Sequence, residues 1–248
     1  MTGTVIANPP RNASVAIVGA GDYIGAAIAR RFAAEGYLVF MGRRNGDKLL
    51  PLKQEIEAAG GRAEARTLDA REEAQVAAFI DEAEAAAPLE VAIFNVGANV
   101  NFPFLETTAR VFRKVWELAC FAGFLTGREA ARVMLPRRKG SIFFTGATAG
   151  LRGGSGYAAF ASAKFGIRAV AQSAARELGP QGIHVAHLVI DAGVDTEWVR
   201  ERLRASGADE ERALLQPSSV AETYWALHRQ SSDAWTFETE IRPSTETW

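Results

Sequence analysis

Short apolar runs alternate with amphipathic segments along most of this 248-residue chain, and this alternation constrains the fold more than any other feature. We predict buried strands at the apolar runs 15–18, 38–41, 63–68, 91–94, 141–145 and 183–190. Helices are predicted near 23–35, 48–59, 72–86, 108–135 and 156–178. Strands that alternate with helices in this way favour a mostly parallel sheet with helices on both faces.

The pattern continues without a break that would divide the chain into domains. No linker, repeat or low-complexity segment is visible, so one α/β domain over 14–248 is the simplest interpretation. Residues 1–13, which include Pro9 and Pro10, are expected to form a flexible tail. Thr107 is the expected N-cap of the long fourth helix, and a last strand is expected near 236–241.

Composition argues against several classes of protein. The net charge of -1 does not indicate the excess of basic residues that is typical of nucleic-acid-binding proteins. No apolar run approaches the ~20 residues that span a bilayer. The first residues lack the pattern of a signal peptide, and no cluster of Cys, His and carboxylates has metal-ligand spacing. Cys120 is the single cysteine, so no internal disulfide can form, and we expect a reducing, cytoplasmic setting.

A glycine-rich loop joins the first predicted strand to the first predicted helix. Its glycines let the backbone turn tightly and approach a phosphate, and the helix that follows offers free N–H groups. We therefore predict that the loop binds the phosphates of a dinucleotide, although a plain tight turn would also use glycines. The predicted cofactor-binding residues of the loop are Gly19, Gly21, Asp22, Tyr23, Ile24 and Gly25.

The spacing of this loop resembles the TGxxxGxG loop of the short-chain dehydrogenase/reductase superfamily, with Val18 in place of Thr and Tyr23 in place of the middle glycine. Other motifs of that superfamily follow the third, fourth and sixth predicted strands, with Asp191 where the last motif has proline. The resemblance implies a Rossmann-type, doubly wound, three-layer αβα fold that binds a nicotinamide dinucleotide. It adds to the predicted cofactor-binding set Asp69, Ala70, Asn95, Val96, Gly97, Val194 and Thr196.

The end of the second predicted strand discriminates between the two nicotinamide cofactors. Folds that bind NAD usually place an acidic residue there for the ribose 2′-hydroxyl, whereas an arginine accommodates the 2′-phosphate of NADP. This chain has Arg43 and Arg44, and no acidic residue before Asp47. Because two guanidinium groups can clamp a phosphate, NADP(H) is predicted in preference to NAD(H), with a solvated basic turn as the alternative.

Most of the catalytic positions implied by the resemblance have lost their polar groups. In the superfamily a tyrosine transfers the proton, a lysine four residues later lowers the pKa of that phenol, a serine positions the substrate and an asparagine supports a relay water. Lys164 occupies the lysine position, and we predict that it also holds the cofactor ribose. The other three positions hold Phe160, Ala147 and Ala119, whose side chains neither donate nor accept a proton.

Two hydroxyl groups close to Lys164 in the sequence are candidate replacements. Tyr157 precedes Lys164 by seven residues, a spacing that resembles the enoyl-thioester reductases, where a tyrosine stabilises an enolate. Seven residues make nearly two helical turns, so the two side chains are expected on one helix face. Thr148 follows the serine position and can offer a hydroxyl to substrate. The predicted catalytic set is Tyr157, Lys164 and Thr148, although Tyr157 could instead line the pocket or cap the helix.

Two further features are implied by the resemblance. Residues near 196–217 follow the sixth predicted strand, where the superfamily carries its substrate lid, and the alternation of apolar and charged residues there suits a mobile helical cover. The long fourth and fifth helices resemble those that pair between subunits, which implies a homodimer or homotetramer. A small-molecule substrate is expected, and neither nucleic acid nor a membrane is an expected partner.

Three functions stay open at this point. The first is an NADP(H)-dependent oxidoreductase that transfers hydride to or from a carbonyl or conjugated C=C bond of a small apolar substrate, with Tyr157, Thr148 or water as the proton source. The second is a redox-inactive sensor or scaffold that binds NADP, which the residues Phe160, Ala147 and Ala119 favour. The third is a lyase or isomerase on the same fold.

Overall fold

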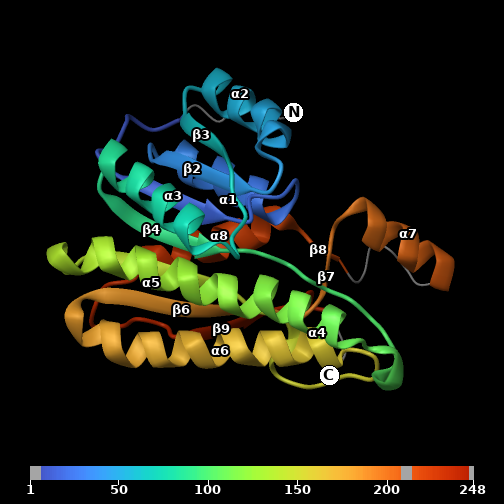
Figure 1. The fold of residues 1–248 in the computed structure, drawn as a ribbon. Coiled ribbons are helices and arrows are strands. Elements are labelled where there is room, and N and C mark those ends of the chain that lie inside the picture. The colour runs from blue at the N-terminus through green and yellow to red at the C-terminus, as the bar shows by residue number, and fades with distance from the viewer. Residues whose placement is uncertain (1–6, 208–213, 246–248) are drawn as a thin grey trace.

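Seven parallel strands form the central sheet of the computed structural model, which describes residues 7–207 and 214–245 (Figure 1). The strands follow the spatial order β3-β2-β1-β4-β5-β6-β9. They are β1 (Ser14–Val18), β2 (Leu38–Arg43), β3 (Arg62–Thr67), β4 (Leu89–Phe94), β5 (Gly140–Thr145), β6 (Ile183–Ile190) and β9 (Glu238–Ile241). Each neighbouring pair is parallel, which confirms the prediction from the alternating pattern.

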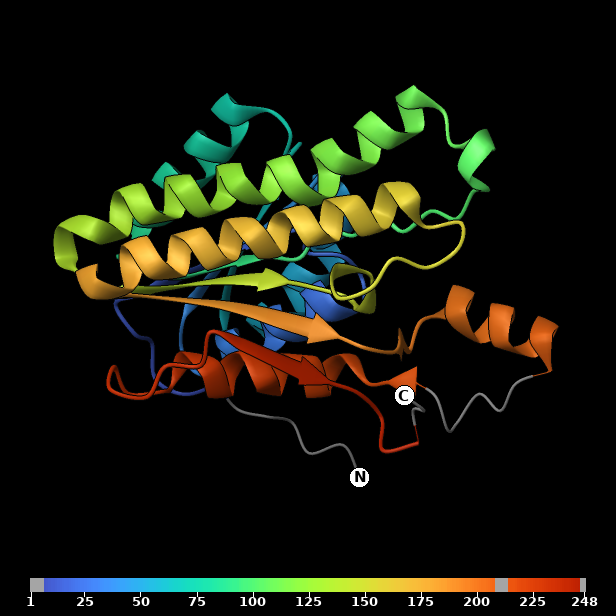
Figure 2. The ribbon, with the colours of Figure 1, turned by 90° about the horizontal axis from the view of Figure 1, so that it is seen from below.

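Helices cover both faces of this sheet (Figures 1 and 2). The α-helices within the described residues are α1 (Ile24–Ala34), α2 (Leu50–Ala58), α3 (Glu73–Ala86), α4 (Ala109–Trp116), α5 (Ala122–Met134), α6 (Ala158–Leu178), α7 (Glu197–Ser206) and α8 (Pro217–His228). One core cluster joins the sheet to α1, α2 and α8, and a second joins it to α3, α5 and α6. Because both faces are covered, β1 and β6 are buried along their whole length. The three-layer, single-domain prediction is confirmed.

The strand order reverses at β1, and this reversal positions the site. In the register of the sheet, Val18 at the end of β1 is paired with Gly42 of β2 and with Phe94 of β4. The loops that follow these three strands therefore begin side by side. In open α/β sheets such a reversal opens a crevice at the carboxyl ends of the strands, where ligands bind.

The predicted long helix, 108–135, is one helix with an irregular centre. One π-helical turn, Glu117–Phe121, joins α4 to α5, and such turns often occur at functional sites. The helix is capped by Thr108, whose Oγ1 accepts a hydrogen bond of 3.2 Å from the Val111 amide. The prediction that Thr107 is the cap was wrong by one residue, because the Thr107 hydroxyl donates to the carbonyl oxygen of Pro103 instead.

Two other predicted boundaries differ from the structure. Helix α6 begins at Ala158, so Tyr157 is the residue before its first turn and not part of the helix. Part of the expected tail is packed on the domain: the amides of Asn8 and Arg11 donate to the carbonyl oxygens of Ala34 and Gly36, each at 2.8 Å. Residues 1–6 of that tail lie outside the described residues.

Helix α7 projects beyond the sheet, and a small strand pair forms its base (Figures 1 and 2). Strands β7 (Gly193–Val194) and β8 (Leu214–Leu215) pair in parallel, which sequence reasoning missed because each has only two residues. Residues 208–213 of the predicted lid lie outside the described residues. No helix within the described part of the chain is long and apolar enough to span a bilayer.

Candidate active site

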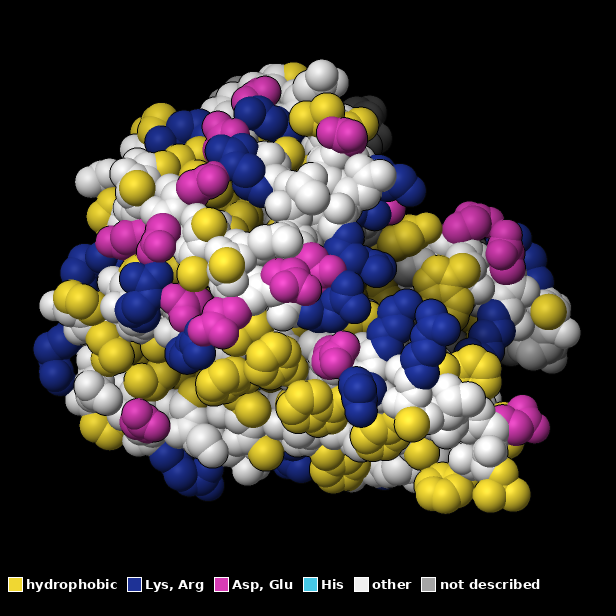
Figure 3. Space-filling view, viewed as in Figure 1, with side chains coloured by type: hydrophobic (Ala, Val, Ile, Leu, Met, Phe, Trp, Pro, Cys, Tyr) yellow, Lys and Arg dark blue, Asp and Glu magenta, His cyan; other side chains and the backbone are white. Residues whose placement is uncertain are grey.

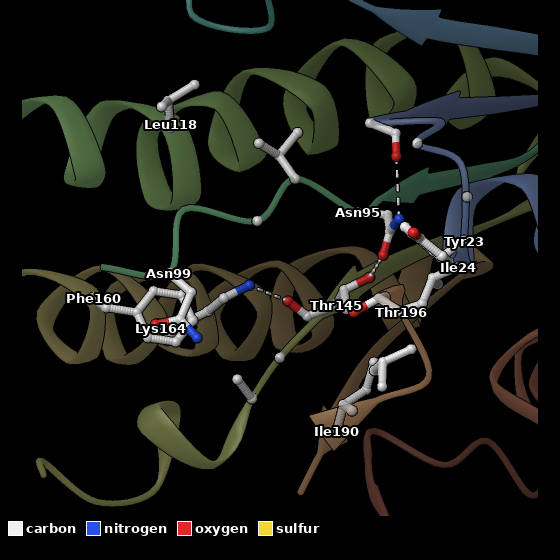
Figure 4. Close-up of a pocket in the computed structure, with 18 of the residues that line it drawn as sticks. Tyr23, Ile24, Asn95, Asn99, Leu118, Thr145, Phe160, Lys164, Ile190 and Thr196 are labelled. Carbon is white, nitrogen blue, oxygen red and sulfur yellow. Dashed lines mark hydrogen bonds between the residues drawn. The ribbon is translucent and has the colours of Figure 1, made fainter. Parts of the chain in front are cut away.

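A cavity of about 1090 Å³ lies at the carboxyl ends of the strands, with Lys164, Asn95 and Tyr23 among its walls (Figure 4). Its lining includes every site residue predicted from the sequence, although these residues come from distant parts of the chain. They are Gly19, Gly21, Asp22, Tyr23, Ile24, Gly25, Arg43, Arg44, Asp69, Ala70, Asn95, Val96, Gly97, Thr148, Tyr157, Lys164, Val194 and Thr196. The predicted catalytic and cofactor-binding sets therefore share one cavity.

The glycine loop has the backbone geometry of a phosphate cradle. Gly19 has a φ of +92°, and a Cβ atom there would lie 2.8 Å from the carbonyl carbon of Asn95. A Cβ atom on Gly25 would lie 2.6 Å from the Cα of Ala20, whereas one on Gly21 would meet nothing within 4 Å. Helix α1 then begins at Ile24 without a side-chain cap. Its first N–H groups and the open space at Gly21 fit the pyrophosphate of a dinucleotide.

Asn95 ties this loop to the neighbouring strands. Its Nδ2 donates to the carbonyl oxygen of Gly19 at 3.1 Å, and its Oδ1 accepts from the Thr145 hydroxyl at 3.0 Å (Figure 4). The Thr145 hydroxyl also lies 2.7 Å from the buried hydroxyl of Tyr224 on α8. The two hydrogen bonds of the Asn95 amide thus hold the chain after β1 next to the end of β5. Asn95 therefore positions the other residues of the site.

Lys164 projects from α6 to the carboxyl end of β5 (Figure 4). Only 3% of its surface is exposed, and its Nζ donates a hydrogen bond of 2.8 Å to the carbonyl oxygen of Thr145. Burial lowers the pKa of Lys164 to about 8. A buried ammonium has three hydrogens to donate, and the cavity that Lys164 lines can accommodate a hydroxyl-rich partner such as a ribose.

The groups around Lys164 are apolar where a proton relay would need polar atoms. The centre of the Phe160 ring lies 5.8 Å from Nζ of Lys164. Ala119 is fully buried in the π-helical turn, and Ala147 lines the cavity beside Thr148. Cys120 is buried next to Ala119, and burial raises the pKa of its thiol, which disfavours the reactive thiolate.

A comparison with known families agrees with this arrangement. The family model described as short chain dehydrogenase matches residues 13–207. The chain belongs to the short-chain dehydrogenase/reductase family. Relatives in this family are named as dehydrogenases and reductases.

Individual members of the family cover most of the chain. A solved short-chain dehydrogenase from Rhodopseudomonas palustris is 64% identical, with a TM-score of 0.83 over 94% of this chain and 100% of that one. A short-chain dehydrogenase/reductase of Armillaria gallica is 33% identical over 173 residues, which make up 68% of this chain and 66% of that protein. A 3-oxoacyl-(acyl-carrier-protein) reductase of Mycobacterium avium is 29% identical over 202 residues, 79% of this chain and 74% of that protein. Several other solved structures with this fold hold NADP or NADPH.

At the end of this short-chain dehydrogenase site that holds Arg43 and Arg44, one of the two arginines forms an ion pair with an acidic residue of the protein itself. Nη1 of Arg43 lies 2.6 Å from Oδ1 of Asp22 in the glycine loop. Arg44 is exposed beside it and also lines the cavity. Asp69 is held by Arg71 in a two-point contact, which lowers the pKa of the Asp69 carboxyl. Sequence reasoning missed the pairing of Arg43, which joins residues far apart in the chain.

Tyr157 stands at the cavity wall just before α6. Its ring packs against an apolar cluster that includes Val115 and Phe160, and its backbone has a φ of −107° and a ψ of 20°. Within the described residues no hydrogen bond is formed by its hydroxyl, which leaves that group available to a ligand. Tyr157 is the residue that caps the start of α6 and it lines the same cavity as Lys164, as the alternative interpretation from the sequence allowed.

Thr148 is hydrogen-bonded to a residue that sequence reasoning had noted only for its departure from the family motif. The Thr148 hydroxyl donates to Oδ1 of Asp191, at the end of β6. Nη2 of Arg242, just after β9, lies 3.3 Å from Oδ2 of the same carboxylate. In the sequence, the one signal that could have indicated this contact was a carboxylate at a position where the family motif has proline.

The segment that carries α7 is linked to the glycine loop. The backbone amide of Glu197 donates to the Tyr23 hydroxyl at 3.3 Å, and the Thr196 hydroxyl accepts from the Val199 amide at the start of α7. Trp198 lines the cavity with 52% of its surface exposed. Further lining residues that were not predicted are Lys48, Asn99, Leu118, Arg152 and Ile190. In the part of the chain that is described, no group of three or more His, Cys, Asp or Glu residues could hold a metal ion.

Proposed function

We propose that this chain is an NADP(H)-dependent oxidoreductase that transfers hydride to or from a carbonyl or a conjugated C=C bond of a small apolar substrate. One observation carries the proposal: a single cavity joins the glycine loop, two arginines and the buried Lys164. The NADP-bound members of the fold support the choice of cofactor. A bound nicotinamide would supply or accept the hydride.

The residues of this chain divide the cavity into two functional regions. In one, the N–H groups at the start of α1 would hold the pyrophosphate, and Arg43 and Arg44 would hold the 2′-phosphate. In the other, Lys164 would hold the ribose, while Tyr157 and Thr148 would present hydroxyl groups to the substrate. Leu118 of the π-helical turn and the ring of Phe160 would give one side of that region an apolar surface.

The proton in this site must come from a group other than the phenol that the family places next to the lysine. Tyr157 has a free hydroxyl within the described structure, and Thr148 and Lys164 also line the cavity. General acid–base catalysis typically contributes a factor of ~10²–10⁴ to a rate. We therefore expect Tyr157→Phe to reduce turnover by about that factor if Tyr157 is the donor.

The test is a comparison of binding and turnover. Calorimetry should detect NADPH binding that is tighter than NADH binding, and a panel of ketones and enones should oxidise NADPH stoichiometrically. Absence of NADPH binding would contradict the proposal outright. NADPH binding without oxidation by any member of the panel would favour the redox-inactive sensor, which the apolar residues Phe160, Ala147 and Ala119 also support. Turnover without a change in cofactor absorbance would favour a lyase or isomerase.

We also propose that the chain assembles as a homodimer or homotetramer through α4, α5 and α6. Hydrophobic side chains gather over this layer on the face seen in Figure 3. Four large ones are about two-fifths exposed, namely Phe112, Trp116, Phe124 and Phe165. A groove of about 640 Å³ between α5 and α6 includes Phe124 and Val170. Apolar patches of this kind usually mark interfaces. The cytoplasmic location predicted from the single cysteine stays a prediction.

A further inference from the structure

A carboxylate and a hydroxyl meet at the wall of the cavity, and both oxygens of the carboxylate are engaged. Thr148, which lines the cavity, donates its hydroxyl hydrogen to Oδ1 of Asp191. Asp191 is buried, with 8% of its surface exposed, and its Oδ2 lies 3.3 Å from Nη2 of Arg242. Arg242, which also contacts the Glu240 carboxylate, thereby supplies part of its charge to a carboxylate that has been removed from water.

The backbone fixes this pair in place. The Asp191 amide donates to the carbonyl oxygen of Ile241 at 3.0 Å, which ties the end of β6 to β9. Thr148 begins a tight turn that ends at Gly150, and a Cβ atom on Gly150 would lie 3.1 Å from the carbonyl oxygen of Lys164. The turn therefore packs directly on α6 at the position of Lys164. The backbone positions of both partners are therefore fixed by the sheet and by α6.

The direction of this hydrogen bond decides what Thr148 can offer to a ligand. A carboxylate only accepts hydrogen bonds, so the single hydrogen of the Thr148 hydroxyl is used on Asp191. The lone pairs that remain on Thr148 Oγ1 can only accept. A carbonyl oxygen also only accepts, whereas the O–H of an alcohol can donate. At Thr148 the cavity wall therefore complements the hydroxyl group of an alcohol and not the carbonyl oxygen of a ketone.

We propose that Asp191 is a positioning residue that makes Thr148 the hydrogen-bond acceptor for the hydroxyl group of an alcohol substrate. This inference rests on the proposed function and adds to it a substrate class, an alcohol, which the site would oxidise. The carbon-bound hydrogen leaves as hydride to the oxidised nicotinamide cofactor, and the C=O bond forms. The hydroxyl proton passes to Thr148 as Thr148 passes its own hydrogen to Asp191, and Asp191 then releases that proton to solvent.

The test uses a matched pair of small probes, 2-propanol and acetone, whose binding is followed by NMR titration of the whole protein with and without NADP. The wild-type protein should bind 2-propanol with about tenfold higher affinity than acetone. This is the scale of one hydrogen bond, here from the alcohol to a Thr148 hydroxyl that donates its own hydrogen to a carboxylate. Thr148→Val should abolish the preference, and Thr148→Ser should retain it.

Asp191→Asn is the decisive variant because it has the same shape. Its amide oxygen would face Arg242 and its NH₂ group would face Thr148, so the Thr148 hydrogen would be released towards the cavity. The preference should then reverse in favour of acetone. Glu238→Gln is the matched control, because Glu238 is a carboxylate of the neighbouring edge strand β9 that pairs with Arg168 and does not line the cavity. This control should leave the preference unchanged.

Three results would overturn the inference: equal affinity for the two probes in the wild-type protein, binding of neither, or an unchanged preference in Asp191→Asn. NADPH binding is measured separately by calorimetry. Loss of that binding would contradict the proposed function, whereas the probe preference in the unloaded protein would still decide the role of Asp191.

Discussion

The ammonium nitrogen of Lys164 lies 5.8 Å from the centre of the Phe160 ring and donates a hydrogen bond of 2.8 Å to the carbonyl oxygen of Thr145. The lysine is thus held in place by the backbone of β5 and does not need a phenol to fix it. Its position is retained although the acid that it would normally assist is replaced by a phenyl ring. This arrangement permits a direct test of how much of the family's proton transfer can be restored.

Phe160→Tyr should restore an acid beside Lys164. The nearby ammonium should lower the pKa of the new phenol below its usual value of about 10, which ultraviolet difference titration can measure. We expect carbonyl reduction to increase by about 10²-fold, at the low end of general acid catalysis. Phe160→Leu is the control for altered packing. A phenol that titrates normally and gives no gain in rate would show that Phe160 does not stand in the reactive position.

The burial of Lys164 should make stability depend on pH in alkaline solution. Its pKa is about 8 in the folded protein and about 10.5 when unfolded, so between these values the unfolded chain binds more protons. The free energy of unfolding should therefore increase from pH 8 to pH 10.5 by about 3 kcal/mol from this group. Denaturant unfolding at several pH values should show that Lys164→Met lacks this increase. Parallel pH curves for the two proteins would contradict the prediction.

Arg44 should determine the preference for NADP(H), and Asp22 should oppose it. Arg44→Ala removes an exposed guanidinium and should weaken NADPH binding by about ten- to hundredfold, with little effect on NADH. Asp22→Asn releases Arg43 from its 2.6 Å contact and should strengthen NADPH binding. Calorimetry with both cofactors measures both effects. A similar loss of NADPH and NADH affinity in Arg44→Ala would mean that the 2′-phosphate lies elsewhere.

His228 should cause a loss of stability in mild acid. Its Nε2 lies 2.8 Å from the Tyr37 hydroxyl and its Nδ1 lies 3.1 Å from the Ser141 hydroxyl. Burial lowers its pKa to about 4, against the nearby charge of Glu90, which raises it. Between pH 6.5 and pH 4 the unfolded chain binds the extra proton, so the free energy of unfolding should fall by about 3 kcal/mol as the pH decreases. Thermal unfolding of His228→Gln should show a smaller decrease over this range.

The exposed aromatic layer of α4 to α6 should hold subunits together. Phe165→Glu places a charge in the centre of that layer and should reduce the measured mass to that of a single chain in light scattering. Trp198→Glu is the control, because Trp198 is an aromatic residue that is more exposed than Phe165 but lies on α7. A wild-type protein that is already a single chain would contradict the proposed assembly.

The sequence was sufficient to predict the sheet and the loops that line the cavity at its edge, because both depend on local rules. Apolar strands and glycines at required backbone positions can be recognised within a few residues. The contact between Thr148 and Asp191 joins residues 43 positions apart, and no local rule indicates it. The first residue of α6 was misplaced for a different reason. Helix boundaries depend on the first turn, and the pattern did not reveal that α6 starts one residue after Tyr157.

The small strand pair at the base of α7 has a consequence for the origin of specificity. Val194 is paired with Leu215, and the backbone amide of Asp195 donates to the carbonyl oxygen of Leu215 at 2.9 Å. The segment that carries α7 therefore begins and ends at neighbouring positions on the domain. An insertion or deletion between these anchors would not shift the register of the seven-stranded sheet, and lengthening a loop of this kind costs little free energy. We therefore expect this segment to differ in length and sequence between relatives while the cofactor-binding part of the fold stays the same. Such differences would let one fold accept many different substrates.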